Sequence, residues 1–400
     1  MVGIMLFAKL NDLSIGGKGS YGIAASAVER KADLPTYLRI TDIFDDGTLN
    51  LSELKSVDAP NSDKYILKPN DIVFARTGGS TGRNYFYDGS DGVFVYAGFL
   101  IKFSIDPEKV NPKYVKYYCR SKQYNDWVQS FNTGSTRGNI NAQTFGNMEI
   151  PLPERKQQDY LVSILEPIDE KIRNNKQVND NLEQQAQAIY HERFETVSPN
   201  DLPSDWRIVT LGEVATISNK SFNPLKEPEI LLEHYSIPAF DETRFPVFEL
   251  STSIKSNKFI IDASCFMISK LNPTTKRVWK PYCLTGNAVC STEFIVYKAK
   301  DQSITDFLYS VIDSGSFSDF MCSHVTGSTG SRQRTTPSDT LSYELILPSE
   351  DELAEFQSLV SPMYAQMRIN AIENDKLKRL RDSLLPKLMS GEIDVSSVHL

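Results

Sequence analysis

The chain has 400 residues, of which 40% are hydrophobic and 24% are charged, and its formal net charge is −8. These values are typical of a soluble globular protein with two or three domains. They argue against a nucleic-acid binder that depends on overall positive charge, although local basic surfaces stay possible. Five cysteines without a C-x-x-C pair indicate a reduced, cytoplasmic protein without a zinc site. The first ten residues show no basic leader, and no apolar run approaches the ~18 residues of a membrane span, so neither a signal peptide nor a membrane segment is expected.

The first part of the chain, residues 1 to about 150, predicts a domain of short strands and turns. Its β-rich runs, residues 37–40, 71–75 and 93–96, are bounded by Gly, Asn and Asp. A helix is expected from Pro112 to about Phe131, because a proline at the first helical position does no harm. Residues 148–153 end a strand and open a long helix that should continue to about Glu195.

From Leu202 the same plan starts again. Residues 211–214 compare with 10–13, residues 260–268 take the place of 67–75, and residues 293–297 take that of 99–103. The tetrapeptide T-G-S-T at residues 133–136 recurs 193 positions later. The chain is therefore predicted to be an internal duplication. The expected parts are a first globular domain at 1–152, a first spacer helix at 153–198, a second globular domain at 199–347, and a second spacer helix with a C-terminal tail at 348–400.

Residues 161–189 and 356–384 share a 3.5-residue apolar repeat over about four heptads, the pattern of a coiled-coil seam. The two stretches lie 195 positions apart and match position for position. Each seam is interrupted by asparagines at equivalent places, Asn175 and Asn179 in the first and Asn370 and Asn374 in the second. A polar residue in a seam lowers stability but fixes register, because only a partner polar group satisfies it. We expect the two helices to pack on each other with register set by the asparagines; two ordinary amphipathic helices are the alternative.

The fold class that follows is α/β, with mixed α+β heads: two globular heads related by a pseudo-twofold axis and separated by two long antiparallel coiled-coil helices. The helices are antiparallel because each must leave one head and deliver the chain to the other. A seam of this length spans roughly 40 Å at 1.5 Å per residue. Two heads at that separation would address sites about one turn of B-DNA apart, or slightly more.

A search for catalytic motifs finds no active site. Residues 16–20 resemble a phosphate-binding loop only superficially, because glycine follows the lysine. No G-x-G-x-x-G follows a strand, and the asparagine–proline–proline–aromatic motif of amino-methyltransferases is absent from the sequence. The four histidines are scattered and form no metal-ligand pair. The triplet at residues 53–55 could belong to a nuclease, but a solvated turn is the far more common origin of such a triplet.

Basic and amide side chains gather instead in loops at corresponding places of the two halves. Lysine and arginine suit phosphates, and arginine, asparagine and glutamine bond the edges of guanine and adenine. Any single one of these residues could belong to an ordinary solvated loop, but the occurrence of such clusters at equivalent places in both halves favours contact with DNA. The predicted DNA-binding residues are Lys18, Arg76, Arg83, Asn84, Tyr85, Lys116, Arg120, Arg137, Asn139, Lys270, Lys276, Arg277, Lys280, Arg332 and Arg334.

With these features the sequence resembles the specificity subunit of type I restriction–modification systems. The resemblance covers nearly the whole chain. It rests on the duplicated plan, on T-G-S-T-x-x-x-I at residues 133–140, on I-P-L-P at 150–153 and on L-L-P-K-L-M-S-G-E-I at 384–393. The second T-G-S-T continues as Gly330, Ser331 and Arg332 instead of R-G-N-I, and the first half lacks the proline and tryptophan leader of residues 202–206.

The resemblance implies a non-catalytic subunit whose two globular domains, at 1–152 and 199–347, are target-recognition domains that each read one half of a split sequence in double-stranded DNA. Its implied partners are two methyltransferase (modification) subunits, which carry S-adenosylmethionine and methylate adenine at N6, and restriction subunits, which add ATP- and Mg-dependent translocation and cleavage. No cofactor or metal is expected on this chain itself. One alternative is a non-catalytic two-headed interaction scaffold that does not bind DNA, which the acidic net charge favours slightly. A self-sufficient nuclease or methyltransferase would require a site that the sequence does not show.

Overall fold

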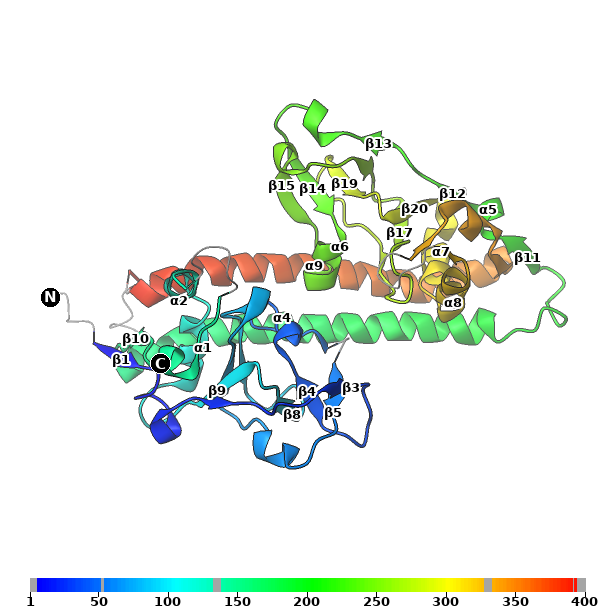
Figure 1. The fold of residues 1–400 in the computed structure, drawn as a ribbon. Coiled ribbons are helices and arrows are strands. Elements are labelled where there is room, and N and C mark those ends of the chain that lie inside the picture. Colours follow the sequence, from blue (N-terminus) through cyan, green and yellow to red (C-terminus); the bar gives the residue numbers. More distant parts are fainter. Residues whose placement is uncertain (1–5, 52–53, 132–137, 327–332, 391, 394–400) are drawn as a thin grey trace. The chain divides into compact units, whose positions relative to one another are not determined.

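The computed structural model describes residues 6–51, 54–131, 138–326, 333–390 and 392–393. It divides into two compact units. Unit 1 combines Met1–Glu170 with Leu377–Leu400, and unit 2 is Lys171–Lys376. The two long helices, α4 and α9, therefore contribute residues to both units (Figure 1).

The described residues of unit 1 form two four-stranded sheets, a separate strand pair and three short helices. The first sheet has the order β2-β9-β6-β7, and the second has the order β3-β5-β4-β8. The strands are β1 (Phe7–Lys9), β2 (Ser20–Tyr21), β3 (Ala27–Val28), β4 (Thr36–Leu38), β5 (Lys55–Val57), β6 (Asp71–Ala75), β7 (Asn84–Tyr87), β8 (Phe94–Tyr96), β9 (Leu100–Ser104) and β10 (Glu149–Pro151). The helices are α1 (Pro112–Tyr118), α2 (Lys122–Gln129) and α3 (Ala142–Gly146). Strands β1 and β10 form the separate antiparallel pair.

Unit 2 repeats this plan. Its first sheet has the order β12-β20-β17-β18, and its second has five strands in the order β13-β16-β19-β14-β15. The strands are β11 (Arg207–Thr210), β12 (Ala215–Ile217), β13 (Ser221–Phe222), β14 (Leu231–Tyr235), β15 (Val247–Leu250), β16 (Lys258–Ile260), β17 (Cys265–Ser269), β18 (Val278–Trp279), β19 (Ala288–Ser291), β20 (Phe294–Ala299), β21 (Val325–Thr326), β22 (Arg334–Thr335) and β23 (Glu344–Leu347). The helices are α5 (Leu211–Val214), α6 (Ile237–Thr243), α7 (Thr305–Ile312) and α8 (Gly315–Ser323).

The duplication extends to the register of the central strands. In unit 1, Phe74 of β6 pairs with Ile101 of β9; in unit 2, Ile268 of β17 pairs with Ile295 of β20. Both members of the second pair lie 194 positions after those of the first. The internal repeat predicted from the sequence is thus a repeat of strand order and register in the first sheet, whereas the second sheet of unit 2 has a fifth strand and a different order.

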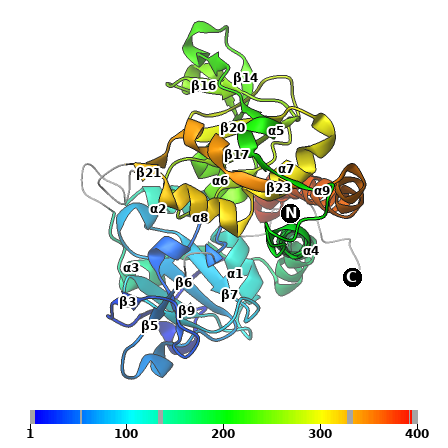
Figure 2. The same ribbon diagram turned by 90° about the vertical axis from the view of Figure 1, so that its right-hand side faces the viewer.

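The first sheet of each unit is buried on both faces. In unit 1, Ile72 and Phe74 of β6 belong to the core cluster with α1, α4 and Leu385 of α9, whereas Val73 and Ala75 face the second sheet. In unit 2, helices α7, α8 and α9 cover the equivalent face of β17 and β20 (Figure 2). Burial on both sides explains why the central strands are continuous apolar runs without alternation.

The helix expected from Pro112 to about Phe131 is two helices, so this prediction was wrong in one respect. Helix α1 ends at Tyr118, and α2 begins at Lys122. The side chain of Ser121 accepts a hydrogen bond from the backbone N–H of Tyr124 at 3.2 Å. Serine at this position caps a new helix start, because it satisfies a donor that the first turn leaves free.

The long helices are α4 (Arg155–Tyr190), which continues as a π-helical turn to Glu195, and α9 (Glu350–Ser390). Within unit 2, Asn175 Nδ2 donates to Asn374 Oδ1 at 2.9 Å, and Asn370 Nδ2 donates to Asn179 Oδ1 at 2.8 Å. Residue numbers rise along one helix as they fall along the other, so the pair is antiparallel, as predicted. All four asparagines form hydrogen bonds between the helices; control of register by them stays a prediction.

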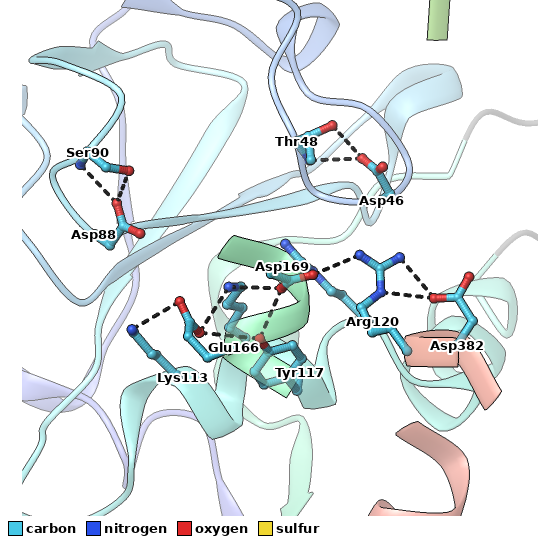
Figure 3. Close-up of polar contacts among 12 residues, drawn as sticks. Asp46, Thr48, Asp88, Ser90, Lys113, Tyr117, Arg120, Glu166, Asp169 and Asp382 are labelled. Atoms are coloured by element: carbon cyan, nitrogen blue, oxygen red, sulfur yellow. Dashed lines mark hydrogen bonds and ion pairs between the residues drawn. The ribbon is translucent and has the colours of Figure 1, made fainter. Parts of the chain in front are cut away.

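Within unit 1, the same helices meet at an ion-pair network centred on Asp169 of α4. Its Oδ1 accepts from Arg381 Nη1 of α9 at 2.9 Å, and its Oδ2 accepts from Arg120 Nη1 at 2.9 Å and from Tyr117 OH at 3.0 Å. Lys116 Nζ lies 3.2 Å from Oδ2. Figure 3 shows Tyr117 and Arg120 turned toward Asp169. The network connects the segment around α1 to both long helices.

The carboxylate of Asp169 is only 9% exposed. Burial by itself would raise its pKa, but the positive charges of Arg120, Lys116 and Arg381 outweigh that effect and hold the pKa of Asp169 far below the usual carboxyl value. Burial lowers the pKa of Lys116, and the nearby Arg120 lowers it further. The network therefore carries several charges whose burial is tolerated because they are paired.

The asparagine contact can be measured with a double-mutant cycle on Asn179 and Asn370. Asn370→Leu leaves the Asn179 amide oxygen without its donor, which should lower the free energy of unfolding by about 1–2 kcal/mol. The double variant Asn179→Leu/Asn370→Leu should recover much of this loss, since no unpaired polar group is left. Urea unfolding followed by helical circular dichroism gives all four values, and Gln184→Leu, at an exposed position of α4, is the control. Strictly additive single effects would contradict the contact.

Replacement of Asp169 should have a pH-dependent effect on stability. Asp169→Asn should lower the free energy of unfolding at pH 7 by about 3–5 kcal/mol, because three cations lose their shared partner. A depressed carboxyl pKa stabilises the fold above the unfolded-state value, 3.8, and this stabilisation is lost as pH falls toward the folded-state value. The difference in the free energy of unfolding between wild type and variant should therefore become smaller only below about pH 4.

This measurement uses Trp127 fluorescence in chains that carry Trp206→Phe and Trp279→Phe, so that the signal comes from unit 1. The control is Asp126→Asn, which breaks the exposed pair of Lys122 and Asp126 and should change the stability by less than about 1 kcal/mol. An equal loss at pH 7 and pH 3 for Asp169→Asn would contradict the assigned charge state.

Candidate nucleic-acid interface

Arg76 follows the last residue of β6 and lies against an aromatic ring. Its guanidinium carbon is 5.2 Å from the centroid of Tyr21, and the Tyr21 hydroxyl accepts a hydrogen bond from the Ala142 backbone N–H at 3.1 Å. No carboxylate in the part of the chain that the structure describes pairs with Arg76. Tyr21 itself is 42% exposed. A guanidinium held by a ring keeps its charge available for a phosphate or a guanine edge.

Asn139 lies at the same edge of unit 1 as Arg76. Thr77, the residue after Arg76, forms an antiparallel bridge with Asn139, and the backbone N–H of Ile140 donates to the Arg76 carbonyl at 2.9 Å. The Asn139 side chain is exposed. Lys18 is also exposed, in the turn that follows the 3₁₀ segment Ile15–Gly17. Of the predicted residues in unit 1, the structure thus brings Arg76 and Asn139 together.

Arg83, Asn84 and Tyr85, around β7, make contacts inside unit 1. Arg83 Nε pairs with Asp45 Oδ1 at 2.6 Å, and Asn84 Nδ2 donates to the Cys119 carbonyl at 3.1 Å. The Tyr85 hydroxyl donates to Asp91 at 2.7 Å, and burial raises the pKa of Tyr85. Asn84 and Tyr85 are buried, so their side chains hold the sheet to its surroundings.

Lys116 and Arg120 belong to the network around Asp169. Lys116 is 6% exposed and also lies 3.4 Å from Glu166 Oε2. Lys113, on the same helix, pairs with Glu166 Oε1 at 3.0 Å. The side chains of Lys113, Lys116 and Arg120 are therefore directed at α4, where they pair with Glu166 and Asp169 inside unit 1.

The basic run after β17 in unit 2 is also paired with acids. Arg277 forms a two-pronged contact with Asp241, at 2.5 Å and 2.9 Å. Lys276 Nζ lies 2.8 Å from Asp313 Oδ1, and burial of Asp313 raises its pKa to about 6. Lys280 pairs with Asp306. Lys276 is the most exposed of these cations, at 41%.

The aromatic residues within this basic run are structural. Trp279 is 3% exposed and packs edge-on to Tyr235 and Phe240. The Tyr282 hydroxyl donates to the Arg244 carbonyl at 3.0 Å. These two rings are therefore not available to pack on a sugar or base while they occupy these positions.

Lys270 and Arg334 meet at the edge of unit 2. Arg334 holds Glu293 through Nε and Nη2, each 3.0 Å from a carboxylate oxygen. The backbone N–H of Thr335 donates to the Lys270 carbonyl at 3.1 Å. Lys270 is half-buried, and no carboxylate among the described residues pairs with it. Arg137 and Arg332, together with most of the two T-G-S-T turns, lie outside the described residues.

The acidic partners are what sequence reasoning missed. Asp45 precedes Arg83 by 38 positions and Asp241 precedes Arg277 by 36, and each is on a different element from its arginine. A signal does exist, because the two arginines lie 194 positions apart and the two aspartates 196 apart. A duplicated charge pair at nearly the duplication offset indicates a structural contact instead of a ligand contact. Tyr21 was missed because a lone exposed tyrosine carries no pattern.

The described residues contain no group of three or more His, Cys, Asp or Glu placed to hold a metal ion. Within the same residues, no helix is both long and apolar enough to cross a membrane. An open cavity of about 470 Å³ lies in unit 2 beside α7 and α9. It is lined by Lys280, Asp306, Gln357 and Ser361 among others. Its cation is already paired with its acid, so the cavity does not single out a class of ligand.

Comparison with known proteins connects these features to one family. The model of the type I restriction modification DNA specificity domain matches residues 29–184. The type I restriction enzyme MjaIX specificity subunit of Methanocaldococcus jannaschii is 24% identical over 323 residues, which cover 74% of this chain and 72% of the relative. The HindI specificity subunit of Haemophilus influenzae is 21% identical, with 94% of this chain and 98% of the relative covered.

A solved structure extends the likeness to the fold. The crystal structure of the type I restriction–modification S subunit from M. genitalium matches with a TM-score of 0.56 at 16% identity, and 97% of each chain is covered. At this identity the likeness concerns the fold alone, which is the two-unit arrangement of mixed sheets and long helices described above. The chain is thus similar in sequence to specificity subunits of type I restriction–modification systems, and similar in fold to one S subunit of such a system.

Proposed function

We propose that this chain is the DNA-reading subunit of a type I restriction–modification complex. Each unit reads one half of a bipartite target in double-stranded DNA, and the chain directs partner adenine methyltransferase subunits to that target. The observation that carries the proposal is that the first sheet of each unit uses the same strand order and register, with different side chains after its central strand. A repeated frame with unlike surfaces suits a protein that reads two unlike half-sites.

The chemistry of these edges supports a nucleic-acid ligand. Arg76 and Lys270 are cations without a carboxylate partner among the described residues, and Asn139 is an exposed amide. These are the side-chain types that contact phosphates and base edges. Apart from Lys18, the other predicted cations among the described residues are all paired with acids of their own unit. A small set of unpaired cations on an acidic chain predicts weak DNA binding by the chain alone.

The long helices are the proposed docking surface for the modification subunits. Val178 of α4 and Leu359 and Ile369 of α9 are large apolar residues that are 41–55% exposed in the chain alone. Exposed apolar side chains on a helix favour burial against a protein partner. In this proposal the chain has no catalytic role; the partners carry S-adenosylmethionine, and restriction subunits, where present, carry ATP and Mg. The alternative, a two-headed scaffold that does not bind DNA, has the acidic net charge in its favour.

Charge reversal separates these two functions. In the complex with modification subunits, Arg76→Glu and Lys270→Glu should each weaken binding to target DNA by about 10-fold or more. Each should also reduce the slope of log K against log salt by about 1. Fluorescence anisotropy with a labelled duplex over 50–200 mM salt gives both quantities.

The matched control is Lys109→Glu, which reverses a more exposed cation of unit 1 that pairs with Asp106. The scaffold alternative would be favoured if Arg76→Glu and Lys270→Glu changed the affinity no more than this control does. It would also be favoured if the complex bound target and random DNA equally at every salt concentration.

A further inference from the structure

The residues that follow β6 and β17 have the same backbone environment in the two units. The Arg76 N–H donates to the Phe99 carbonyl at 3.1 Å, and the Lys270 N–H donates to the Glu293 carbonyl at 2.9 Å. Phe99 and Glu293, like Arg76 and Lys270, lie 194 positions apart. Each of the two residues therefore leaves its central strand against the segment that leads into the neighbouring strand, β9 or β20.

In each unit, a third segment donates a backbone hydrogen bond to the residue that follows the central strand. The Arg76 carbonyl accepts from the Ile140 N–H, and the Lys270 carbonyl accepts from the Thr335 N–H. The residue after Arg76 bridges to Asn139, and the residue after Lys270 bridges to Arg334. Three positions are thus fixed by equivalent backbone hydrogen bonds in both units. We call them the reading triplets: Arg76, Phe99 and Asn139 in unit 1, and Lys270, Glu293 and Arg334 in unit 2.

The backbone of the triplets is shared, but their side chains differ in chemical class. Unit 1 presents a guanidinium, an aromatic ring that is 58% exposed and an amide. Unit 2 presents an ammonium group and a guanidinium that is held by a carboxylate. Side chains that differ while their backbone hydrogen bonds are retained are not required by the fold. This is the pattern expected of residues that determine what each unit recognises.

Arg76 is the member whose chemistry is most specific. The ring of Tyr21 supports the guanidinium, and no carboxylate among the described residues competes for it. The planar fork of arginine matches O6 and N7 of guanine, a two-acceptor pattern that no other base presents in the major groove. Lysine offers only a point charge, which suits a phosphate as well as a base.

On the basis of the proposed function, we propose that the reading triplets determine the two half-sites, and that Arg76 reads a guanine in the first of them. Asn139 reads an adjacent base through its amide. In unit 2, Arg334 reads the second half-site together with Lys270, and Glu293 is a positioning residue that orients the guanidinium of Arg334.

The test uses the complex of the full chain with its modification subunits. Duplexes randomised in one half-site at a time are incubated with S-adenosylmethionine, and methylated molecules are sequenced. Arg76→Ala should lower the preference for guanine at one position of the first half-site by about 10- to 100-fold and leave the second half-site unchanged. Arg76→Lys should lose the same preference while total DNA affinity stays within a fewfold. Lys270→Ala and Arg334→Ala should alter only the second half-site.

Lys109→Ala is the control and should alter neither half-site. A uniform loss of methylation with Arg76→Ala and Arg76→Lys, without a change of base preference at any position, would make Arg76 a phosphate contact and overturn the proposal. Changes in both half-sites from a single substitution would overturn it too. Circular dichroism of each variant shows whether it is folded, and Arg76→Lys still decides if Arg76→Ala is not. If the wild-type complex methylated no split sequence, the proposed function itself would fail, which is a distinguishable result.

Discussion

The pairing of the two long helices is the constraint on which each unit depends. In unit 1, Asp169 and Arg381 bind each other across the helices, and in unit 2 two asparagine pairs do the same. Polar contacts of this kind stabilise little by themselves, but they are satisfied in only one alignment of the helices. An apolar seam would tolerate a shift of one heptad, whereas the shift would leave these groups buried without partners. We therefore expect these contacts to fix the register of the helices, and with it the surface on which the sheets of each unit pack.

The duplication keeps some polar contacts and replaces others. The ion pair of Arg83 and Asp45 recurs as the ion pair of Arg277 and Asp241. In each unit the arginine directly precedes the strand β7 or β18, so the pair attaches this strand to its unit in the same way. By contrast, the place of Asp169 in α4 is taken in α9 by Tyr364, whose hydroxyl lies 2.7 Å from Ser310 Oγ. Helix α7 carries Asp306 at the place where α1 carries Lys113. The charges of the short helix and of the long helix that it contacts are therefore not repeated in the second unit. Each unit thus satisfies one backbone plan with its own electrostatics.

The sequence allowed the fold class, the duplication and the antiparallel helices to be predicted, because each rests on a pattern that repeats along the chain. The asparagine positions were informative because a buried amide requires a partner. A second repeated signal, Pro167 in α4 and Pro362 at the equivalent place in α9, went unused. The break at Ser121 was missed because a serine cap lay within a continuous helical pattern. The interface was harder, because a cation with a distant acidic partner, such as Arg277, reads in sequence like a free one such as Arg76.

The central claim is that one chain uses two copies of a fold to read the two halves of a DNA target for a methyltransferase. Methylome sequencing tests it most directly, in cells that carry this gene with and without the genes of the modification subunits. The account predicts N6-methyladenine at a split motif with an unread spacer, present only when both are expressed. Methylation that did not depend on this gene, or no motif with both expressed, would contradict the account and leave a scaffold that does not read DNA.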